Sequence, residues 1–335
     1  MRFAVLGAGA VGQLAAWRLS SAGHSMTLVS PRSWGRIASS NDVFKVTRRD
    51  GSVSEHSLHV APDLATALGN APHGSSPSAS SLPSPDALLL CTKSYQTLPA
   101  LRLPHSPHPI PPSTALILLQ NGLGAHEALR AAYPHHVVIL GTTTNGAYLT
   151  APNHVAHSGQ GETYFGVLPR ATHVDKHEQA TLDHVITSFA QSEFGAAPDA
   201  SILSRLWCKL GVNCCVNALT ALLGCRNGAL EMLSADADPL IDAISDEVAR
   251  VARSAGGVDL AAADVRDFTR RTVASTRANW SSMAVDMKRG GGTECDDISG
   301  FVVAKGKEVG VEVPVNETLW RLLRCKQALG GKEEK

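Results

Sequence analysis

The hydrophobic and polar positions follow two different periods along the chain, and the period changes near residue 200. Before that point, short and fully apolar runs recur between polar segments, as expected for strands buried in a parallel sheet. From residue 201 onward, apolar residues recur every three or four positions, which is the period of helices packed on one face. The pattern predicts an α/β domain over residues 1–200 and an all-helical domain over residues 201–330. The buried strands are expected at residues 3–6, 26–29, 87–91, 115–119 and 137–141.

Less regular segments complete this outline. Further strand material is expected at residues 41–60, a glycine-rich crossing strand at 155–166, and a last short strand at 194–197. Helices are expected at residues 11–19, 63–68, 176–189, 206–227, 239–254, 261–274, 294–309 and 315–328. Thr293 is the expected N-cap of the helix at 294–309. Residues 70–85 and 104–112 are rich in Pro and polar residues without periodicity and are expected to form surface insertions.

A glycine-rich loop follows the first predicted strand. Glycines at positions 7, 9 and 12 have the GxGxxG spacing and stand between a strand and an amphipathic helix. The first glycine permits a sharp turn, the second lets a pyrophosphate approach the backbone, and the third lets helix and strand pack closely. The alternative is a glycine-rich loop without a ligand. In this setting the motif predicts dinucleotide binding by Gly7, Ala8, Gly9, Ala10, Val11 and Gly12.

The residues after the second strand bear on the choice of dinucleotide. A site for NAD usually has Asp or Glu there to hold the ribose 2′-hydroxyl, whereas this chain has Ser30, Pro31 and Arg32. Arg32, helped by Ser30 or Arg36, would form charge-assisted hydrogen bonds with a 2′-phosphate. The sequence therefore predicts NADPH rather than NADH as the cofactor.

Polar residues also follow two of the apolar strands. Lys93 comes shortly after the strand at 87–91, and Asn121 shortly after the strand at 115–119. In α/β folds, ligands bind beyond the carboxyl ends of the sheet strands. Lys93 and Asn121 are therefore candidate ligand-binding residues, although ordinary loop residues occur at such positions too.

A polar stripe runs along the first long helix of the second half. Lys209, Asn213 and Asn217 stand four residues apart, so their side chains fall on one narrow face among apolar neighbours. Asparagine is a poor helix former and lysine is rarely buried, so the stripe costs stability unless a polar ligand offsets it. A solvated helix face is the alternative explanation.

Composition excludes several classes of protein. Of 335 residues, 44% are hydrophobic and 18% are charged, with 30 Lys+Arg against 30 Asp+Glu, which gives no excess charge for binding nucleic acid. No apolar run approaches the roughly 18 residues that a membrane helix needs. The chain opens directly into a strand, leaving no room for a targeting peptide. A cytoplasmic protein without nucleic-acid or membrane partners is expected.

The seven cysteines include no CxxC pair, and most of them stand inside apolar helical runs. Cysteines in such positions are usually small buried hydrophobic residues. They are therefore expected to be reduced, and no metal site is expected. The lack of a spaced Cys/His ligand set also disfavours a zinc-dependent medium-chain dehydrogenase.

Several motifs together resemble one family. GAGAVG, TKSYQT, QNGLG, HSGQGET, KLGVNCCVNALTAL, CRNG, SSMAVDM and TECDDISG occur in the order and approximate spacing of the ketopantoate reductases, the 2-dehydropantoate 2-reductases. The resemblance covers nearly the whole chain. It implies a Rossmann-type N-terminal domain, an all-α C-terminal domain of the 6-phosphogluconate dehydrogenase C-terminal-like type, and an active site in the cleft between them.

The resemblance also implies an activity and residue roles. The expected reaction is NADPH-dependent reduction of 2-dehydropantoate to (R)-pantoate, on the route to pantothenate and coenzyme A. Lys209 matches the catalytic lysine, a general acid, and Glu294 matches its carboxylate partner. The positions matching substrate-binding residues are Asn213, Asn217, Asn227 and Ser282, and those matching nicotinamide-side residues are Lys93 and Asn121. An acid favouring a helix dipole would also explain Glu294 at the start of a helix.

The chain departs from the family pattern near the implied substrate site. Gly291 stands where the family usually has an arginine, Cys295 changes the TEID motif to TECD, and Ser299 replaces an asparagine. Two alternatives therefore stay open: an NADPH-dependent reductase of another 2-oxo acid or lactone, and a non-catalytic NADP(H)-binding sensor. The joint presence of the lysine, the glutamate, the asparagines and the serine argues against the sensor. Apolar helical surface in the second domain would permit a homodimer.

Overall fold

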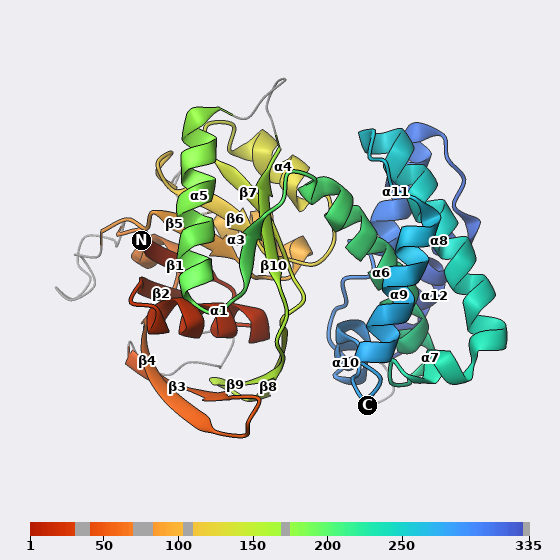
Figure 1. The fold of residues 1–335 in the computed structure, drawn as a ribbon, viewed down its shortest axis with the longest axis horizontal. Coiled ribbons are helices and arrows are strands. Elements are labelled where there is room, and N and C mark those ends of the chain that lie inside the picture. The colour runs from red at the N-terminus through yellow and green to blue at the C-terminus, as the bar shows by residue number, and fades with distance from the viewer. Residues whose placement is uncertain (31–40, 70–82, 103–109, 169–174, 331–335) are drawn as a thin grey trace. The chain divides into compact units, whose positions relative to one another are not determined.

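The computed structural model describes residues 1–30, 41–69, 83–102, 110–168 and 175–330 (Figure 1). Arg32, Arg36 and most of the two expected insertions lie outside these residues. The described chain forms two compact units. Unit 1 comprises Met1–Gln120 and Ala125–Ile202, and unit 2 comprises Asn121–Gly124 and Leu203–Lys335. Unit 1 is α/β and unit 2 is helical, as the change of period along the chain predicts.

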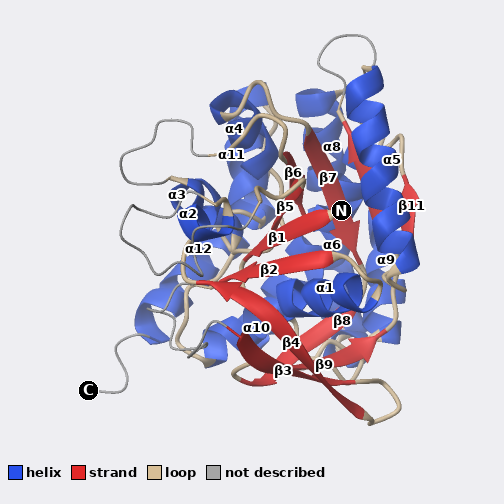
Figure 2. Cartoon of the chain, turned by 90° about the vertical axis from the view of Figure 1, so that its left-hand side faces the viewer, coloured by secondary structure: helices blue, strands red, loops and turns tan. Residues whose placement is uncertain are grey.

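One mixed sheet forms the centre of unit 1 (Figure 2). Its described strands are β1 (Arg2–Leu6), β2 (Ser25–Val29), β3 (Asn41–Thr47), β4 (Val53–Ala61), β5 (Ala87–Leu90), β6 (Ala115–Leu118), β7 (Val138–Thr143), β8 (Gly146–Ala151), β9 (His154–Gly159), β10 (Thr163–Val167) and β11 (Ala196–Pro198). The described helices of unit 1 are α1 (Ala10–Ser21), α2 (Leu64–Ala67), α3 (Thr97–Leu101), α4 (Ala125–Ala132) and α5 (Lys176–Gln191), and η2 (Ser94–Gln96) is a 3₁₀ turn.

The middle of the sheet has the strand order of a dinucleotide-binding fold. The order β4-β2-β1-β5-β6-β7 is parallel throughout and corresponds to the Rossmann order 3-2-1-4-5-6. The order reverses between β1 and β5, so their carboxyl ends flank the crevice where such folds bind ligands. β5 and β6 are buried at every position, which explains their continuous apolar sequence.

An aromatic cluster attaches α5 to the sheet. The ring of Phe189 on α5 lies 4.8 Å from that of Phe165 on β10 and 6.0 Å from that of Phe3 on β1, measured between centroids. Phe194, in the turn after α5, adds a third contact at 5.5 Å. All four rings are at most 1% exposed. In Figure 1, α5 runs along one face of the sheet, as these contacts require.

The expectation of one crossing strand at residues 155–166 was wrong. This segment forms most of β9, a turn, and most of β10, while the unexpected strand β8 pairs antiparallel with β9. Asn153 takes a φ of 56° in the short turn between β8 and β9. Asparagine tolerates this left-handed conformation, and the Pro-Asn-His sequence was the overlooked turn signal.

Unit 2 consists of the helices α6 (Ile202–Leu223), α7 (Ala229–Met232), α8 (Ser234–Gly256), α9 (Ala262–Ser275), α10 (Ser282–Lys288), α11 (Ser299–Val309) and α12 (Pro314–Gly330). α7 and α10 were not expected as helices. α8 begins five residues before Pro239, which lies inside its N-terminal part.

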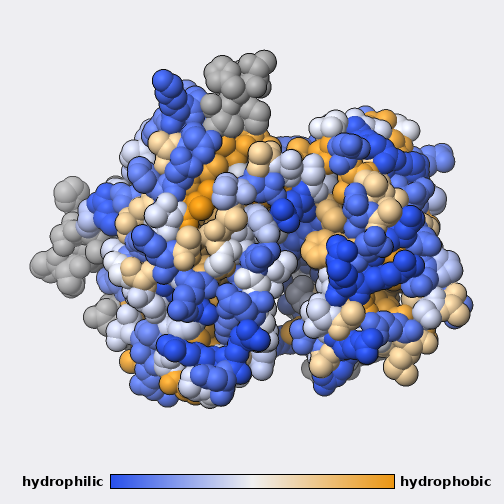
Figure 3. All heavy atoms as spheres, in the orientation of Figure 1, coloured by the Kyte–Doolittle hydropathy of each residue, from blue (hydrophilic) through white to orange (hydrophobic). Residues whose placement is uncertain are grey.

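Polar residues cover much of the molecular face in Figure 3.

The first of these helices ends earlier than expected. Gly224 takes a φ of +64°, and the amide of Cys225 donates to the carbonyl of Thr220 at 3.2 Å, which closes α6. Lys326 on α12 donates to the carbonyls of Ala221 at 2.9 Å and Leu222 at 2.7 Å. A local glycine signal and a distant lysine therefore stop the helix before residue 227.

Within the described chain, α6 is the one helix long and apolar enough to cross a membrane, with a mean hydropathy of 1.4 over an 18-residue window. The expectation that no apolar run approaches that length was therefore too strict. The window is 72% buried inside the structure. Burial of this kind is typical of a core helix, so the helix is weak evidence for a membrane protein.

Candidate active site

The glycine-rich loop joins the carboxyl end of β1 to the start of α1. Gly7 has a φ of +117°, a conformation that residues with a Cβ rarely adopt. A Cβ on Gly7 would lie 2.6 Å from the carbonyl carbon of Cys91, just beyond β5. A Cβ on Gly12 would lie 2.0 Å from the carbonyl oxygen of Gly7. The ends of β1 and β5 and the first turn of α1 therefore meet too closely for larger residues.

Gly9 stands in open space. It is the N-cap residue of α1, and a Cβ placed on it would meet no atom within 4 Å. The first amides of a helix, here including those of Ala10 and Val11, have no acceptor within the helix. Such amides bind phosphate groups. The loop therefore fits the pyrophosphate of a dinucleotide.

Sequence analysis missed a side chain that supports this loop. Gln13 on α1 is 2% exposed, and its Nε2 donates to the carbonyl of the fully buried Ala8 at 2.9 Å. This bond spans the turn between β1 and α1. A glutamine among the apolar residues of a buried helix was the available signal.

The end of β2 carries one described residue of the predicted 2′-phosphate site. Ser30 is 2% exposed, and its amide donates to the carbonyl of Ala61 on β4 at 3.0 Å. Its buried hydroxyl has no hydrogen-bond partner within the described residues. Arg32 and Arg36 lie outside those residues, so their binding to a 2′-phosphate stays a prediction.

A hydrogen-bonded network fixes the backbone next to Lys93. Gln120 donates from Nε2 to the carbonyl of Thr92 at 2.6 Å, and Thr97 donates to Oε1 of Gln120 at 2.9 Å. Lys93 directly follows Thr92, is half-buried, and is the N-cap residue of η2. Asn121 directly follows Gln120, is half-buried, and groups with unit 2.

The polar stripe on α6 passes through the core of unit 2. Lys209 and Asn213 are half-buried, and Asn217 is 8% exposed. Nδ2 of Asn213 is buried and has no partner in the described chain. A buried donor without an acceptor costs about 1–3 kcal/mol. A solvated helix face does not explain this stripe, and a hydrogen-bond acceptor on a ligand would remove the cost. The neighbouring buried residues are Leu210, Val212, Cys214, Cys215, Val216 and Ala218.

The charge of Lys209 is set by two opposing effects. Burial lowers the pKa of the lysine from its ordinary value to about 8, and the carboxylate of Glu294 opposes this lowering. Glu294 is itself 5% exposed, although it stands 85 positions further along the chain. The ammonium group is therefore mostly protonated at neutral pH, yet far more acidic than a lysine in water.

The predicted N-cap at Thr293 was wrong. α11 begins at Ser299 with Ile298 as its N-cap residue, and Glu294 lies in the turns that precede the helix. The amide and hydroxyl of Thr293 both donate to Oε1 of Gln327 on α12, at 3.0 and 2.7 Å. This distant partner, which sequence analysis missed, engages the hydroxyl that was expected to cap the helix. A helix-dipole role for Glu294 loses its basis, because the residue is outside the first turn.

Asn227 and Ser282 differ in their surroundings. Asn227 is 6% exposed, and its Nδ2 donates to Oγ1 of Thr276 at 2.8 Å, while its buried Oδ1 has no described partner. Ser282 is exposed at the start of α10. The preceding Ser281 is buried, caps α10 through the amide of Ala284, and bonds to Thr220 on α6 at 2.7 Å. Of the two serines, Ser282 is the one open to a ligand.

The departures from the family pattern fall into two kinds. Gly291 is exposed, so a side chain at this position would reach solvent or a ligand. Cys295 is 1% exposed and Ser299 is fully buried. The two buried changes therefore alter packing behind the Glu294 turn, whereas the glycine removes a group from the surface.

Potential metal-ligating side chains are scattered through the part of the chain that the structure describes. No group of three or more His, Cys, Asp or Glu side chains there could hold a metal ion. All seven cysteines are free, and burial raises the pKa of Cys91 to about 12 and that of Cys208 to about 11. These thiols are therefore protonated at neutral pH.

Two family models match the chain. The model of ketopantoate reductase PanE/ApbA matches residues 3–170, and that of its C-terminal domain matches residues 201–327. The chain belongs to the ketopantoate reductase family. A relative named 2-dehydropantoate 2-reductase from Vibrio cholerae is 33% identical, with 97% of each chain covered. Relatives of the same name from Halobacterium salinarum and Pyrococcus horikoshii are 31% and 29% identical, with at least 98% of each chain covered.

Solved structures share the fold of these ketopantoate reductases. A PanE/ApbA family ketopantoate reductase from Ralstonia eutropha has a TM-score of 0.78 at 24% identity, with 98% of this chain and 99% of that chain covered. D-mandelate dehydrogenase with NADH and anilino(oxo)acetate has a TM-score of 0.82 at 23% identity and the same coverage. The fold therefore occurs with a nicotinamide cofactor, although these identities carry no inference about substrate.

The different surroundings of Gly9 and Gly12 predict different effects of the same substitution. Gly9→Ala adds a methyl group in open space, so the urea unfolding midpoint should fall only slightly, by the small cost of alanine at an N-cap. Affinity for the nicotinamide cofactor should fall about tenfold or more, equivalent to one lost charge-assisted bond. Gly12→Ala forces a Cβ against the Gly7 carbonyl and should destabilise unit 1 by at least about 1–3 kcal/mol. Urea unfolding and cofactor fluorescence titration measure both effects; equal unfolding midpoints for the two variants would contradict this assignment.

Proposed function

We propose that the protein reduces 2-dehydropantoate to (R)-pantoate with NADPH, in the biosynthesis of pantothenate and coenzyme A. The observation that carries this proposal is Lys209, a half-buried lysine with a pKa of about 8 beside the buried Glu294. It stands on the same helix face as Asn213, whose amide nitrogen has no hydrogen-bond partner among the described residues. Such a group can deliver a proton to an oxygen atom at neutral pH. Family membership supports the choice of substrate.

The two units have separate tasks in this proposal. In unit 1, the loop from Gly7 to Gly12 binds the cofactor pyrophosphate, and the backbone held by Gln120 positions Lys93. When bound, NADPH supplies the hydride that converts the ketone into an alkoxide. In unit 2, Lys209 protonates the alkoxide oxygen, and Glu294 keeps the lysine protonated before transfer. Asn213 and Asn217 donate hydrogen bonds to the oxygen atoms of the keto acid.

The remaining predicted residues orient the substrate. Ser282 is exposed at the start of α10, where its hydroxyl can bond to the substrate carboxylate. The buried Oδ1 of Asn227 accepts no hydrogen bond from the described part of the chain, and its amide nitrogen donates to Thr276. Asn121 joins Lys93 on the nicotinamide side. We assign the enzyme to the cytoplasm and keep the homodimer as a prediction.

The cofactor preference depends on the basic residues after β2. A phosphate-binding Arg32 favours NADPH, because the 2′-phosphate adds charge-assisted hydrogen bonds that NADH cannot form. The wild-type protein should bind NADPH at least about tenfold more tightly than NADH, and Arg32→Ala should remove most of the difference. Fluorescence titration of both cofactors measures this. Equal affinities in the wild type would exclude the NADPH assignment.

The assignment of the proton donor predicts a specific loss of turnover. Lys209→Ala should lower kcat for 2-dehydropantoate by about a hundred to ten thousand fold, because general acid assistance is lost. NADPH should still bind, since its predicted site is in unit 1. The exposed Lys307→Ala on α11 is the matched control and should retain activity. The assay follows NADPH oxidation with 2-dehydropantoate and a panel of other 2-oxo acids.

Each outcome of that assay is informative. Preference for 2-dehydropantoate together with loss in Lys209→Ala supports the reaction and the donor. Turnover of another 2-oxo acid alone would keep the reductase and replace the substrate. Binding of NADPH without any turnover would favour the sensor, and unchanged turnover in Lys209→Ala would exclude it as donor.

The Lys209–Glu294 pair also predicts the pH dependence. Reduction needs the protonated lysine, so activity should be present below a pH of about 8 and decline as the pH rises through that value. Glu294 raises the pKa of Lys209, so Glu294→Gln should lower it and move the decline to a lower pH. The profile of kcat/KM against pH tests the direction. Glu308→Gln on α11 is the control and should leave the pH profile unchanged. If the alkaline limb of Glu294→Gln also stays in place, Glu294 does not tune the pKa of the lysine.

A further inference from the structure

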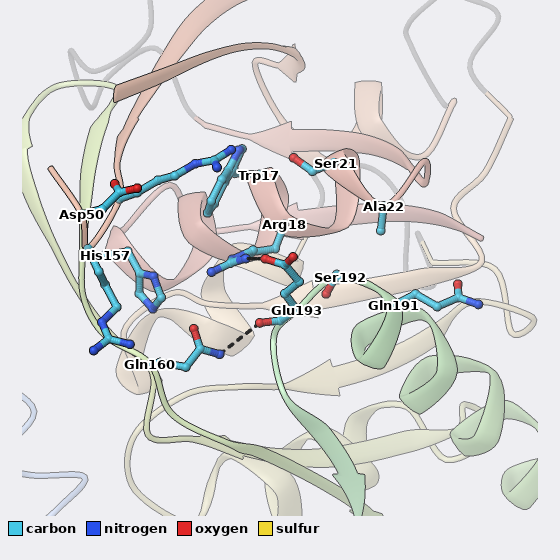
Figure 4. A pocket seen from close by; sticks show the side chains of 12 residues that line it. Trp17, Arg18, Ser21, Ala22, Asp50, His157, Gln160, Gln191, Ser192 and Glu193 are labelled. Atoms are coloured by element: carbon cyan, nitrogen blue, oxygen red, sulfur yellow. Dashed lines mark hydrogen bonds and ion pairs between the residues drawn. The ribbon is translucent and has the colours of Figure 1, made fainter. Parts of the chain in front are cut away.

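A polar cavity in unit 1 lies away from the glycine-rich loop. Its volume is about 380 Å³, and its walls come from the C-terminal half of α1, the β3–β4 turn, β9 and the residues that end α5 (Figure 4). α1 begins at the dinucleotide loop, so Arg18 stands nine positions beyond Gly9, or about 13 Å along the helix. None of the residues predicted to bind cofactor or substrate lines this cavity.

Three arginines line the cavity, and they differ in how many ion pairs and hydrogen bonds they already form. The guanidinium of Arg18 stacks on Trp17 at 4.6 Å and forms an ion pair with Glu193. Arg48 lies 5.4 Å from the same ring and donates from Nε to Oγ of Ser54 at 3.0 Å, which leaves its other nitrogens for a ligand. Arg49 is exposed and has neither ion pair nor hydrogen bond with a described residue.

The imidazole of His157 provides a buried polar atom at the cavity. His157 is 5% exposed, and its Nε2 is buried without a hydrogen-bond partner in the described chain. The pKa of His157 is lowered by burial first and also by the charges of Arg18 and Arg49, while a hydrogen bond to the backbone of Gly159 opposes this. The imidazole is therefore neutral, and its other nitrogen donates to the backbone of Gly159. This leaves Nε2 as an acceptor, near the positive charges of Arg18 and Arg49.

Negative groups also face this cavity. Whether they are already hydrogen-bonded or ion-paired decides the net charge that a ligand would meet. Asp50 accepts from both the amide and the hydroxyl of Ser52, at 2.9 and 2.6 Å. The C-terminal ends of α1 and α5 contribute partial negative charge. The amide of Ala22 donates to the carbonyl of Arg18, and that of Ser192 donates to the carbonyl of Phe189, so part of this charge is already satisfied. Glu193 is the remaining anion, and it neutralises Arg18. Without Glu193, the three arginines outweigh Asp50.

Glu193 occupies the position that an anionic ligand would take. Its side chain is 83% exposed, whereas that of Arg18 is 11% exposed. Its backbone has a φ of 56°, a left-handed conformation that is unfavourable for a glutamate. An exposed side chain on such a backbone can leave the arginine at little cost in packing.

We propose that this cavity binds inorganic phosphate as hydrogen phosphate, and that Glu193 occupies the anion position until the phosphate arrives. The arginines engage the phosphate oxygens through charge-assisted hydrogen bonds. Nε2 of His157 accepts a hydrogen bond from the protonated phosphate oxygen. Sulfate has similar size and charge but no such hydrogen at pH 8, so the histidine distinguishes the two anions.

Calorimetric titration of the full-length protein, saturated with NADPH so that the dinucleotide loop is filled, tests the site at pH 8. Inorganic phosphate, glycerol 3-phosphate and sulfate are the probes. We expect one phosphate per chain, bound at least about tenfold more tightly than sulfate, as one hydrogen bond to a buried group allows. Arg49→Gln should weaken phosphate binding about tenfold, and Glu193→Gln should strengthen it severalfold. Lys45→Gln, which removes a charge from the same hairpin outside the cavity, should have no effect.

The possible results separate the proposal from general anion binding. Glycerol 3-phosphate carries no such hydrogen at pH 8, because the second pKa of a phosphomonoester is about 6. Weaker binding of glycerol 3-phosphate than of inorganic phosphate therefore supports the proposal, and equal or tighter binding would overturn it. A change in the ¹⁵N signal of His157 Nε2 on adding phosphate supports the histidine contact. Equal affinity for sulfate and phosphate, no effect of Arg49→Gln, or an equal loss in Lys45→Gln would each overturn the proposal.

Discussion

The burial of Lys209 beside Glu294 is the interaction on which unit 2 depends for its chemistry. α6 is apolar enough to form the core of this unit, and an isolated ammonium group in such a core would lose its proton. Glu294 limits that loss, and the resulting pKa of about 8 lies close to neutral pH. The same pair restricts the fold, because the turns before α11 must bring Glu294 back to α6. Gln327 on α12 and the Thr293 hydroxyl hold that turn in place.

Unit 1 depends on a different constraint, the close approach of backbone to backbone. The Gly7 carbonyl occupies the space that a Cβ on Gly12 would need, and Cys91 closes on Gly7 from β5. This contact fixes α1 at the point where the strand order reverses. Only Gly9 of the three motif glycines faces open space. Rigid packing therefore holds two of the glycines, and the third leaves room for phosphate.

Local signals in the sequence were enough to predict much of this arrangement. The GxGxxG spacing, the apolar strands and the four-residue period of Lys209, Asn213 and Asn217 all depend on neighbours in the chain, and the structure contains the elements they predict. The strand error at residues 155–166 came from a local turn signal that was overlooked, at Asn153, whereas other differences come from contacts between distant positions. Gln327 engages Thr293, Lys326 caps the end of α6, and Gln120 joins the loops after β5 and β6. Each of these contacts links distant positions, which a local period cannot reveal; the roles of the predicted site residues stay predictions.

The glycine at position 291 leaves Lys209 as the cation that a substrate carboxylate would meet. With no arginine there, Lys209 is the one cation among the residues predicted to contact the substrate in unit 2. A substrate carboxylate near α6 would then join Glu294 in raising the pKa of Lys209, which favours the protonated form but makes it a weaker acid. Asn213, Asn217 and Ser282 can offset this effect by donating neutral hydrogen bonds to the carboxylate, leaving the lysine to the ketone oxygen. Every 2-oxo acid carries the same carboxylate next to its ketone and makes the same demand on these donors, so differences within the substrate panel report how the site contacts the rest of the substrate.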